Sequence, residues 1–396
     1  MAKKLLSPSE AHDELKRRYE RNHRKWLRSG GEWPLAIILG EPTERDVAGH
    51  IEHLRQWVSA WSTWTGGVVR WKEVQWPRLG VQKLPFRLEL ESPEAVAMLV
   101  GEGPRFARAR ERHRELTEQW PTLAGAAAIE RYFDVQADYS DVEFRRLVGL
   151  LSWLLAHPAS NLALRELPVE GIDTKWIEKS RRSLVLDFLQ AITGGASGGD
   201  FWEVCGLRRP QHRVRMVVLC PELRTTLGGL RDLEAPLPDL LQLSLVPSRV
   251  LVVENQESGV ALPDIVGTVA LIKLGASVGA LGAVPWLRGV DCVYWGDIDT
   301  HGFAILNQAR AALGNIKAVL MDEPTLLEHR ALWGYEPQQL ADAELPNLTS
   351  AELTLFRDLR SHRWGPSVRL EQERIPWRYA VEVVRRACEL TSGAAE

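Results

Sequence analysis

The sequence predicts a multidomain protein of mixed α/β and α+β class, with a mostly parallel sheet in its carboxyl-terminal part. The chain has 396 residues, which is too long for one ordinary hydrophobic core. Apolar strand-like segments alternate with helical patterns after residue 248, as they do in βα units of a parallel sheet. The segment 194–199 (GGASGG) is typical of a flexible linker and marks the clearest domain boundary.

The front of the chain is predicted to mix helices and strands. Residues 1–28 are expected to be helical, because Ser7 to Glu10 looks like a helix cap and apolar residues follow at helical spacing. The elements expected next are a strand at 35–39, a helix at 50–61, strands at 66–76 and 83–90, and one long charged helix at 92–119.

Two further helices are expected at 140–156 and 172–192, with Asp173 and Thr174 capping the second. Four cations gather near the start of the second helix, namely Lys175, Lys179, Arg181 and Arg182. A helix, a connection and a basic-fronted helix are compatible with a winged-helix DNA-binding unit, and also with an ordinary helical hairpin.

The rear of the chain is predicted to be an α/β sheet. Its expected strands are 213–219, 249–253, 290–296 and 316–321, with an apolar segment at 269–274, a proline-bearing connection at 232–240, and helices from about 260, at 300–313 and at 324–333. Ligands of such sheets bind at the carboxyl ends of the strands. Glu254 follows one strand, Asp297 and Asp299 follow another, and Asp322 follows a third, so these carboxylates are expected at one edge.

This acidic set predicts a metal centre of toprim type, as in enzymes that cut or copy nucleic acid. Asp297 and Asp299 repel each other unless a cation lies between them, and Mg²⁺, for which Mn²⁺ can substitute, prefers such oxygen ligands. Glu254 would complete the metal shell or deprotonate the attacking water. Alternatively the aspartates only cap the next helix, which leaves Glu254 unexplained. His301 would contact phosphate or a leaving group, or else support that helix start.

Charge is unevenly distributed along the chain. Residues 1–31 carry nine Lys and Arg against four acids, whereas residues 201–396 carry 20 against 24. A basic front and an acidic back suit a nuclease, although a solvated amphipathic helix accounts for the basic segment as well.

Four scattered cysteines without C-x-x-C spacing predict neither a zinc site nor disulfides, and a reducing cytoplasm is the simplest setting. The first residues lack the apolar region of a signal peptide. No run of about eighteen apolar residues predicts a membrane span.

Several strings together resemble the JetD family, the nuclease subunits of the Wadjet anti-plasmid systems. They are Glu254-Asn255, YWGDIDTHG at 294–302, Leu320 to Asp322, RLEQERIP at 369–376 and GIDTKWIE at 171–178. The resemblance implies an amino-terminal arm that contacts a partner or DNA (1–120), a winged-helix, CAP-like domain (121–200) and a toprim nuclease domain related to topoisomerase VI A subunits (201–396).

The resemblance also implies a function and roles for residues. It implies a homodimer that hydrolyses double-stranded, closed circular plasmid DNA with metal, called by an SMC–kleisin, condensin-like complex. Glu254, Asp297 and Asp299 match the toprim acids, and Glu371 and Glu373 either extend the metal site or brace it. The four cations Lys175, Lys179, Arg181 and Arg182 would hold backbone phosphates, which positions DNA without reading its sequence.

Two alternatives remain open at this point. A transesterase like topoisomerase VI A would form a tyrosyl-DNA link through Tyr132 or Tyr139, but neither lies in a recognisable motif of that family, which favours hydrolysis. A non-catalytic DNA-binding adaptor would need no metal, and the complete set of three acids argues against it.

Overall fold

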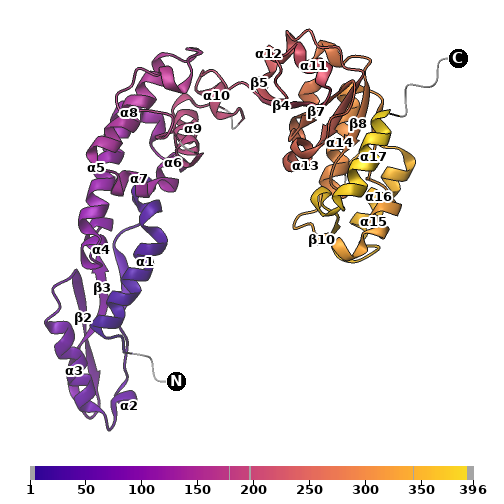
Figure 1. Cartoon of the computed structure of the whole chain (residues 1–396). Helices are drawn as coiled ribbons and strands as arrows, with labels where there is room; N and C mark the ends of the chain where they lie inside the picture. Colours follow the sequence, from indigo (N-terminus) through magenta and orange to yellow (C-terminus); the bar gives the residue numbers. More distant parts are fainter. Residues whose placement is uncertain (1–4, 178, 196–197, 342, 390–396) are drawn as a thin grey trace. The chain divides into compact units, whose positions relative to one another are not determined.

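The computed structural model describes residues 5–177, 179–195, 198–341 and 343–389. The chain forms two compact units, Met1–Pro210 and Gln211–Glu396, each with its own hydrophobic core (Figure 1). This division lies close to the glycine-rich linker, while the finer division of the front part at residue 120 remains a prediction. No helix in the described ranges is both long and apolar enough to span a membrane.

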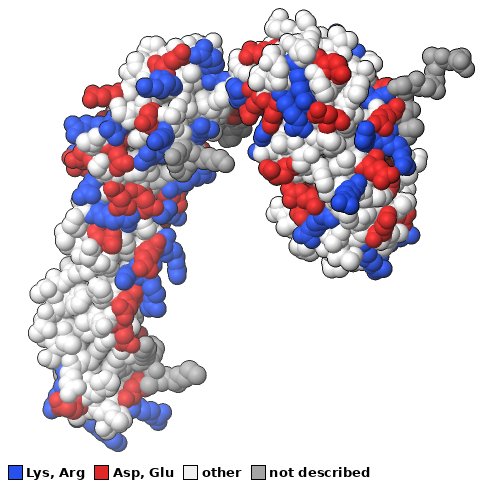
Figure 2. Space-filling view, in the orientation of Figure 1, with Lys and Arg blue, Asp and Glu red and all other residues white. Residues whose placement is uncertain are grey.

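The first helix, α1 (Pro8–Ser29), begins at the cap that the sequence predicts. The Glu10 N–H donates to Ser7 Oγ (3.3 Å), and the Ser7 N–H donates to the Glu10 carboxylate (2.9 Å), a reciprocal capping box. On its outer face Arg24 and Arg28 form ion pairs with acids of neighbouring helices. Figure 2 likewise shows basic and acidic side chains intermixed on the visible face, so part of the amino-terminal basic charge is balanced locally.

A three-stranded antiparallel sheet follows in the order β1-β3-β2. Its strands and adjoining helices are β1 (Leu35–Ile38), α2 (Glu44–Val47), α3 (Ile51–Ser62), β2 (Val68–Trp76) and β3 (Gly80–Leu90). The predicted strands and helix are confirmed here. Along β2 the less exposed positions are Val69, Trp71, Val74 and Trp76, which turn one face of the strand toward the core.

The predicted helix at 92–119 is wrong as a single element. The chain forms α4 (Pro93–Leu99) and then α5 (Gly103–Gln119). Gly101 takes a φ of +81° between them, a conformation that suits glycine and ends a helix. Pro104 lies in the first turn of α5, where its missing N–H costs nothing.

The remaining regular elements of this unit, among the residues that the structure describes, are helices joined by loops and turns, and the winged-helix arrangement remains a prediction. The elements are η1 (Pro121–Leu123), α6 (Ala127–Arg131), α7 (Phe133–Asp138), α8 (Asp141–Ala156), η2 (Leu164–Glu166), α9 (Lys179–Thr193) and α10 (Phe201–Val204). The expected helix start at 172 is wrong, because Asp173 Oδ1 accepts the Trp176 N–H (2.7 Å) and closes a turn before α9.

The carboxyl-terminal unit is built on a six-stranded mixed sheet in the order β5-β4-β7-β6-β8-β9. The strands are β4 (Arg213–Val218), β5 (Asp232–Pro236), β6 (Arg249–Val253), β7 (Thr268–Ile272), β8 (Asp291–Trp295) and β9 (Ile316–Ala318). Strands β7, β6, β8 and β9 are parallel, as predicted, whereas β4 runs antiparallel to both β5 and β7. The expected connection at 232–240 is therefore partly an edge strand.

Helices and short turns cover this sheet (Figure 1). They are α11 (Pro221–Thr225), α12 (Leu237–Leu241), α13 (Gln256–Ala261), η3 (Gly275–Ala283), η4 (Pro285–Leu287), α14 (Thr300–Leu313), α15 (Glu323–Glu328), η5 (Arg330–Leu332), α16 (Ser350–Arg360), η6 (Gln372–Arg374) and α17 (Trp377–Glu389), with a small pair β10 (Gly334–Tyr335) and β11 (Val368–Arg369). Every residue of β6 and β7 is buried, as in a parallel sheet covered on both faces. All four cysteines are buried and unbridged.

Candidate metal centre

The register of β6 and β8 brings Glu254 and Asp297 to the same edge of the sheet. Val253 pairs with Trp295 in this parallel ladder, so both chains leave the sheet at one level. The Glu254 N–H donates to the Trp295 carbonyl (3.1 Å), and the Asp297 N–H lies 3.4 Å from Glu254 Oε2. The predicted neighbourhood of these two acids is present.

Asp299 has two different contacts, one through each carboxylate oxygen. Its Oδ1 accepts the Gly302 N–H (2.7 Å) and caps α14. Its Oδ2 lies 2.9 Å from the Arg369 Nε. Helix capping therefore accounts for one oxygen of Asp299 and leaves the other at the acidic centre, next to a cation.

Arg369 connects the acids, although no sequence pattern singled it out. Its Nη2 donates to Asp297 Oδ2 (2.5 Å), and its Nη1 lies 3.2 Å from Glu371 Oε1. Its Nε, close to Asp299, is buried and makes no hydrogen bond of good geometry. One guanidinium thus supplies the counter-charge for the buried carboxylate of Asp299 and the partly buried one of Asp297.

The string at 369–376 lies across the ends of β6 and β8 and fixes the acids from one side. An antiparallel bridge joins Ile298 and Leu370 through hydrogen bonds of 2.9 and 3.1 Å. The Gln372 N–H donates to Asp297 Oδ1 (2.7 Å), and Gln372 Oε1 accepts the Asn255 N–H (3.0 Å). The bond from Gln372 engages Asp297 Oδ1, the oxygen that Arg369 leaves free, so both oxygens of this carboxylate have a donor.

Glu371 and Glu373 contact residues around the three acids. Glu371 pairs with Arg369 and, at 2.8 Å, with Arg374. Glu373 accepts a hydrogen bond from the side chain of Asn255, the residue that caps α13 through Ser258. Both contacts are of the bracing kind, and a ligand role for either remains a prediction.

Burial and mutual repulsion disfavour the ionised forms of Glu254 and Asp299. Burial, together with the charges of Asp297 and Asp299, raises the pKa of Glu254 to about 7. Burial and the neighbouring Asp297 raise the pKa of Asp299 to about 6, despite the hydrogen bond from Gly302. A divalent cation would favour the ionised forms again, and three carboxylates are donors that Mg²⁺ accepts. The residues therefore fit the metal that the sequence predicts.

His301 lies at the start of α14 with one ring nitrogen engaged. Its Nδ1 is 2.8 Å from Oε1 of the buried Glu336, which also accepts the Thr300 hydroxyl (2.5 Å) and N–H (3.3 Å). The His301 side chain is 53% exposed, so the ring is held at its inner edge and open to solvent at its outer one. Asp299, His301 and Glu336 each offer a donor atom within 4.8 Å of the others.

Other carboxylates and tyrosines considered from the sequence have local partners. Asp322 caps α15 by accepting the Thr325 N–H (2.8 Å). Tyr132 donates to Asp187 (2.8 Å), and burial raises the pKa of its hydroxyl to about 12. The hydroxyl of Tyr139 accepts a hydrogen bond from Arg181 (3.3 Å).

The four predicted phosphate-binding cations belong to the amino-terminal unit. Arg181 forms an ion pair with Glu143 (3.0 Å), and Arg182 lies over the ring of Trp202 and donates to a backbone carbonyl. Lys175 is exposed. Lys179 begins α9, and its side chain lies outside the described part of the structure.

Some residues of the centre were not predicted from the sequence. Arg369 and Gln372 lie within the string that contains Glu371, and an arginine beside predicted metal acids is a signal that could have pointed to it. Tyr294, whose hydroxyl lies 3.4 Å from Glu254 Oε2, closely precedes the acidic pair. Glu336 stands in a segment without periodicity or motif, so no signal marked it.

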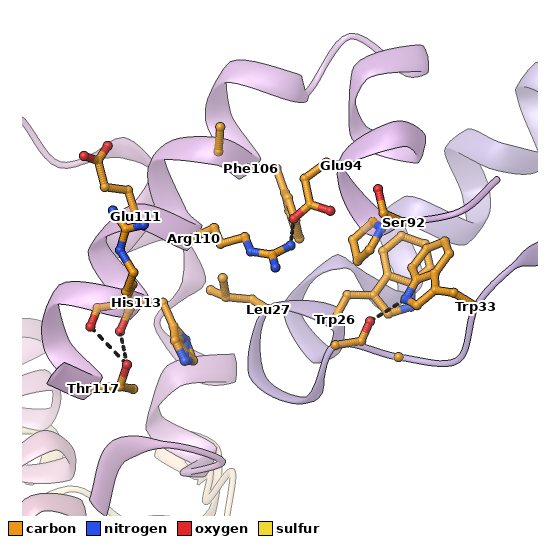
Figure 3. Close-up of a pocket in the computed structure, with 15 residues that line it drawn as sticks. Trp26, Leu27, Trp33, Ser92, Glu94, Phe106, Arg110, Glu111, His113 and Thr117 are labelled. Carbon is orange, nitrogen blue, oxygen red and sulfur yellow. Dashed lines mark hydrogen bonds and ion pairs between the residues drawn. The ribbon is translucent and has the colours of Figure 1, made fainter. Parts of the chain in front are cut away.

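A cavity of about 930 Å³ belongs to the amino-terminal unit. Trp26, Trp33 and Phe106 give it an aromatic wall, and Figure 3 shows Arg110 beside Glu94 at its side. None of the predicted site residues lines it. The metal centre and this cavity are thus features of different units.

Comparison with known families matches both parts of the chain. Residues 206–384, which include all three acids and Arg369, match the carboxyl-terminal part of the Wadjet protein JetD. Residues 8–190 match the amino-terminal region of an uncharacterised protein conserved in bacteria. The comparison with curated proteins returned no match. Because the two family matches leave out little more than the linker and the ends, the chain belongs to the JetD family of Wadjet proteins.

Proposed function

We propose that the chain is a Mg²⁺-dependent endonuclease that hydrolyses phosphodiester bonds of double-stranded, closed circular DNA. In this proposal it is the effector of an SMC-type complex that defends against plasmids. The observation that carries the chemistry is the meeting of Glu254, Asp297 and Asp299 at the ends of adjacent parallel strands. Membership of the JetD family supports the defence role.

Glu254, Asp297 and Asp299 would hold the metal. A bound divalent cation supplies Lewis acidity and lowers the pKa of a coordinated water. Glu254, whose carboxylate the bound cation would keep ionised, can also accept a proton as a general base. Arg369 and Gln372 keep the Asp297 carboxylate oriented through bonds to both oxygens.

The first turn of α14 would receive the scissile phosphate. Asp299 already occupies the Gly302 N–H and Glu336 the Thr300 N–H, so the His301 N–H is the amide of this turn that would favour an anionic oxygen. His301 extends its outer ring edge from the same turn, so it can contact the phosphate or the leaving group. Glu336 fixes the orientation of the ring.

The proposed partners are inferred only from membership of the JetD family. An SMC–kleisin, condensin-like complex would present the plasmid, and a homodimer would place one active site on each strand. The cations of the amino-terminal unit would contribute phosphate contacts that do not depend on sequence.

The test is cleavage of a supercoiled plasmid by the wild-type chain, Asp297→Ala and the control Asp322→Asn, with the partner complex and ATP. Asn caps helices as well as Asp does, so the control keeps α15. Linear product that needs Mg²⁺ or Mn²⁺ and disappears only in Asp297→Ala is the expected result. Cutting that survives Asp297→Ala overturns the assignment of the site.

Two other outcomes identify the alternatives. A covalent protein–DNA adduct that is lost in Tyr132→Phe or Tyr139→Phe would establish a transesterase. DNA binding without cutting under every condition would establish an adaptor.

A further inference from the structure

An open pocket of about 460 Å³ in the amino-terminal unit has a lining unlike that of the metal centre. Its polar lining residues are Arg146, Asp173, Lys175, Trp176 and Arg181. Three of these five side chains are cationic, and one is acidic. The pocket lies between α8 and the turn that precedes α9, where the sequence predicted a helix start.

Two of the cations have no counter-charge among the residues that the structure describes. Arg181 is balanced by Glu143 (3.0 Å). Neither Arg146 nor Lys175 forms an ion pair or side-chain hydrogen bond within the described ranges. Trp176 is 7% exposed, and its Nε1 is buried without an acceptor. Since an unpaired buried donor costs free energy, the lining has more donors to offer than acceptors, and its acid is Asp173.

The backbone around the pocket holds these donors in place. Gly171 has a φ of +74°, and a Cβ there would come within 2.1 Å of the Arg146 Nε. The bare glycine therefore lets the guanidinium lie directly against the turn. The Asp173 carboxylate, the acid of the lining, accepts the Trp176 N–H (2.7 Å) and fixes that turn from within.

We infer that this pocket binds one backbone phosphate of double-stranded DNA, with Arg146 and Lys175 as the principal contacts. Arginine matches two phosphate oxygens at once, lysine adds a point charge, and neither group reads a base. The inference rests on the proposed function, which makes DNA the polyanion that this chain meets. It also revises the prediction from the sequence, because Arg181 is engaged internally and Arg146, on α8, takes its place.

The test measures binding of a metal-free 30-base-pair duplex by fluorescence anisotropy over a range of salt concentrations. Arg146→Gln and Lys175→Gln are compared with the wild-type chain and with Arg165→Gln, an exposed arginine of the same unit outside the pocket. Each pocket variant is expected to weaken binding about 5- to 10-fold near 0.1 M salt, and to lower the slope of log K against log salt by about one. The control should bind like the wild type, and circular dichroism should show all four chains folded.

Pocket variants that are folded and bind the duplex like the wild type overturn the inference. It is also overturned if millimolar inorganic phosphate stabilises the wild-type chain but not Arg146→Gln while duplex affinity is unchanged, because the pocket would then serve a small free anion.

Plasmid cleavage separates this inference from the proposed function. If Asp297→Ala loses cutting while Arg146→Gln binds the duplex normally, the proposed nuclease function is supported and the phosphate-binding pocket is rejected. If Arg146→Gln weakens duplex binding but the wild-type chain never cuts, the phosphate-binding pocket is supported and the nuclease function is rejected.

Discussion

Arg369 Nη2 lies 2.5 Å from Asp297 Oδ2, across 72 positions of the chain. The same guanidinium is 2.9 Å from the Asp299 carboxylate. In the metal-free chain one arginine therefore balances the buried Asp299 and the partly buried Asp297, while Glu254 adds a third, partly buried acid. A divalent cation would compete with Arg369 for the same oxygens. In the absence of metal, removing the charge of Arg369 and removing the charge of Glu254 should therefore change the stability of the fold in opposite directions.

Arg369→Gln should destabilise the metal-free chain by roughly 1–3 kcal/mol, because partly buried acids lose their counter-charge. Urea unfolding in a chelator measures this, and Mg²⁺ should stabilise the variant more than the wild type. Arg363→Gln is the control, since Arg363 is 52% exposed and its ion pair with Asp358 is a surface one. Equal stability of Arg369→Gln and wild type in chelator would contradict the balancing role of Arg369.

Glu254→Gln should have the opposite effect in the same assay. The folded chain raises the pKa of Glu254 to about 7 from 4.5, so folding favours the protonated form. Stability is lost as pH rises from about 4.5 through 7, when the buried carboxyl ionises. At pH 8 in chelator the variant should be more stable by roughly 2–3 kcal/mol, and by less than about 1 kcal/mol at pH 5. If Glu254→Gln were less stable than the wild type at pH 8, ionised Glu254 would not be repelled by Asp297 and Asp299.

Glu336→Ala should cost about 2–4 kcal/mol of stability, because it leaves the buried Thr300 hydroxyl and N–H without their acceptor. It also frees the ring of His301. Thermal unfolding followed by circular dichroism measures the loss. The control is Glu323→Ala, whose carboxylate is exposed and should change stability by less than about 0.5 kcal/mol. A loss no larger than that of the control would exclude Glu336 as the anchor of this turn.

Gly302→Ala should be more disruptive than Gly296→Ala. A Cβ at Gly302 would meet the backbone carbonyl of Asp297 at 2.2 Å, whereas at Gly296 it would meet two side-chain atoms at 2.8 Å, a carboxylate oxygen of Glu254 and a ring carbon of Tyr294. The first change should cost about 1–3 kcal/mol, and the second should chiefly weaken metal affinity. Gly279→Ala, where a Cβ meets nothing within 4 Å, is the control. Equal melting temperatures for all three variants would contradict this packing.

Local patterns predicted the elements that position the acids. The strand 249–253 and the helix 300–313 were expected with the bounds that the structure has. The four apolar residues 250–253 follow Arg249 and are buried, as expected in a parallel sheet covered on both faces, and Asp299 is a strong helix cap. Since the carboxyl ends of parallel strands lie at one edge of the sheet, the proximity of Glu254 and Asp297 could be predicted from these local patterns.

The features that were not predicted from the sequence depend on tertiary contacts. The segment 232–236 pairs with β4 as an edge strand although it carries a proline, and no local periodicity announces that pairing. Arg369 and Glu336 reach the centre from segments that follow it in the chain, held by the β10–β11 pair. Contacts at such separations depend on the assembled fold rather than on neighbouring residues.

Calorimetric titration with Mn²⁺ is the decisive measurement, because it probes the cation site without requiring DNA, partner or turnover. The wild-type chain, Asp297→Asn and Asp322→Asn would be titrated under identical conditions. We expect the wild type and Asp322→Asn to bind Mn²⁺ alike, and Asp297→Asn to lose at least about tenfold in affinity. Unchanged Mn²⁺ binding by Asp297→Asn, or none by the folded wild type, would contradict a metal centre at Glu254, Asp297 and Asp299.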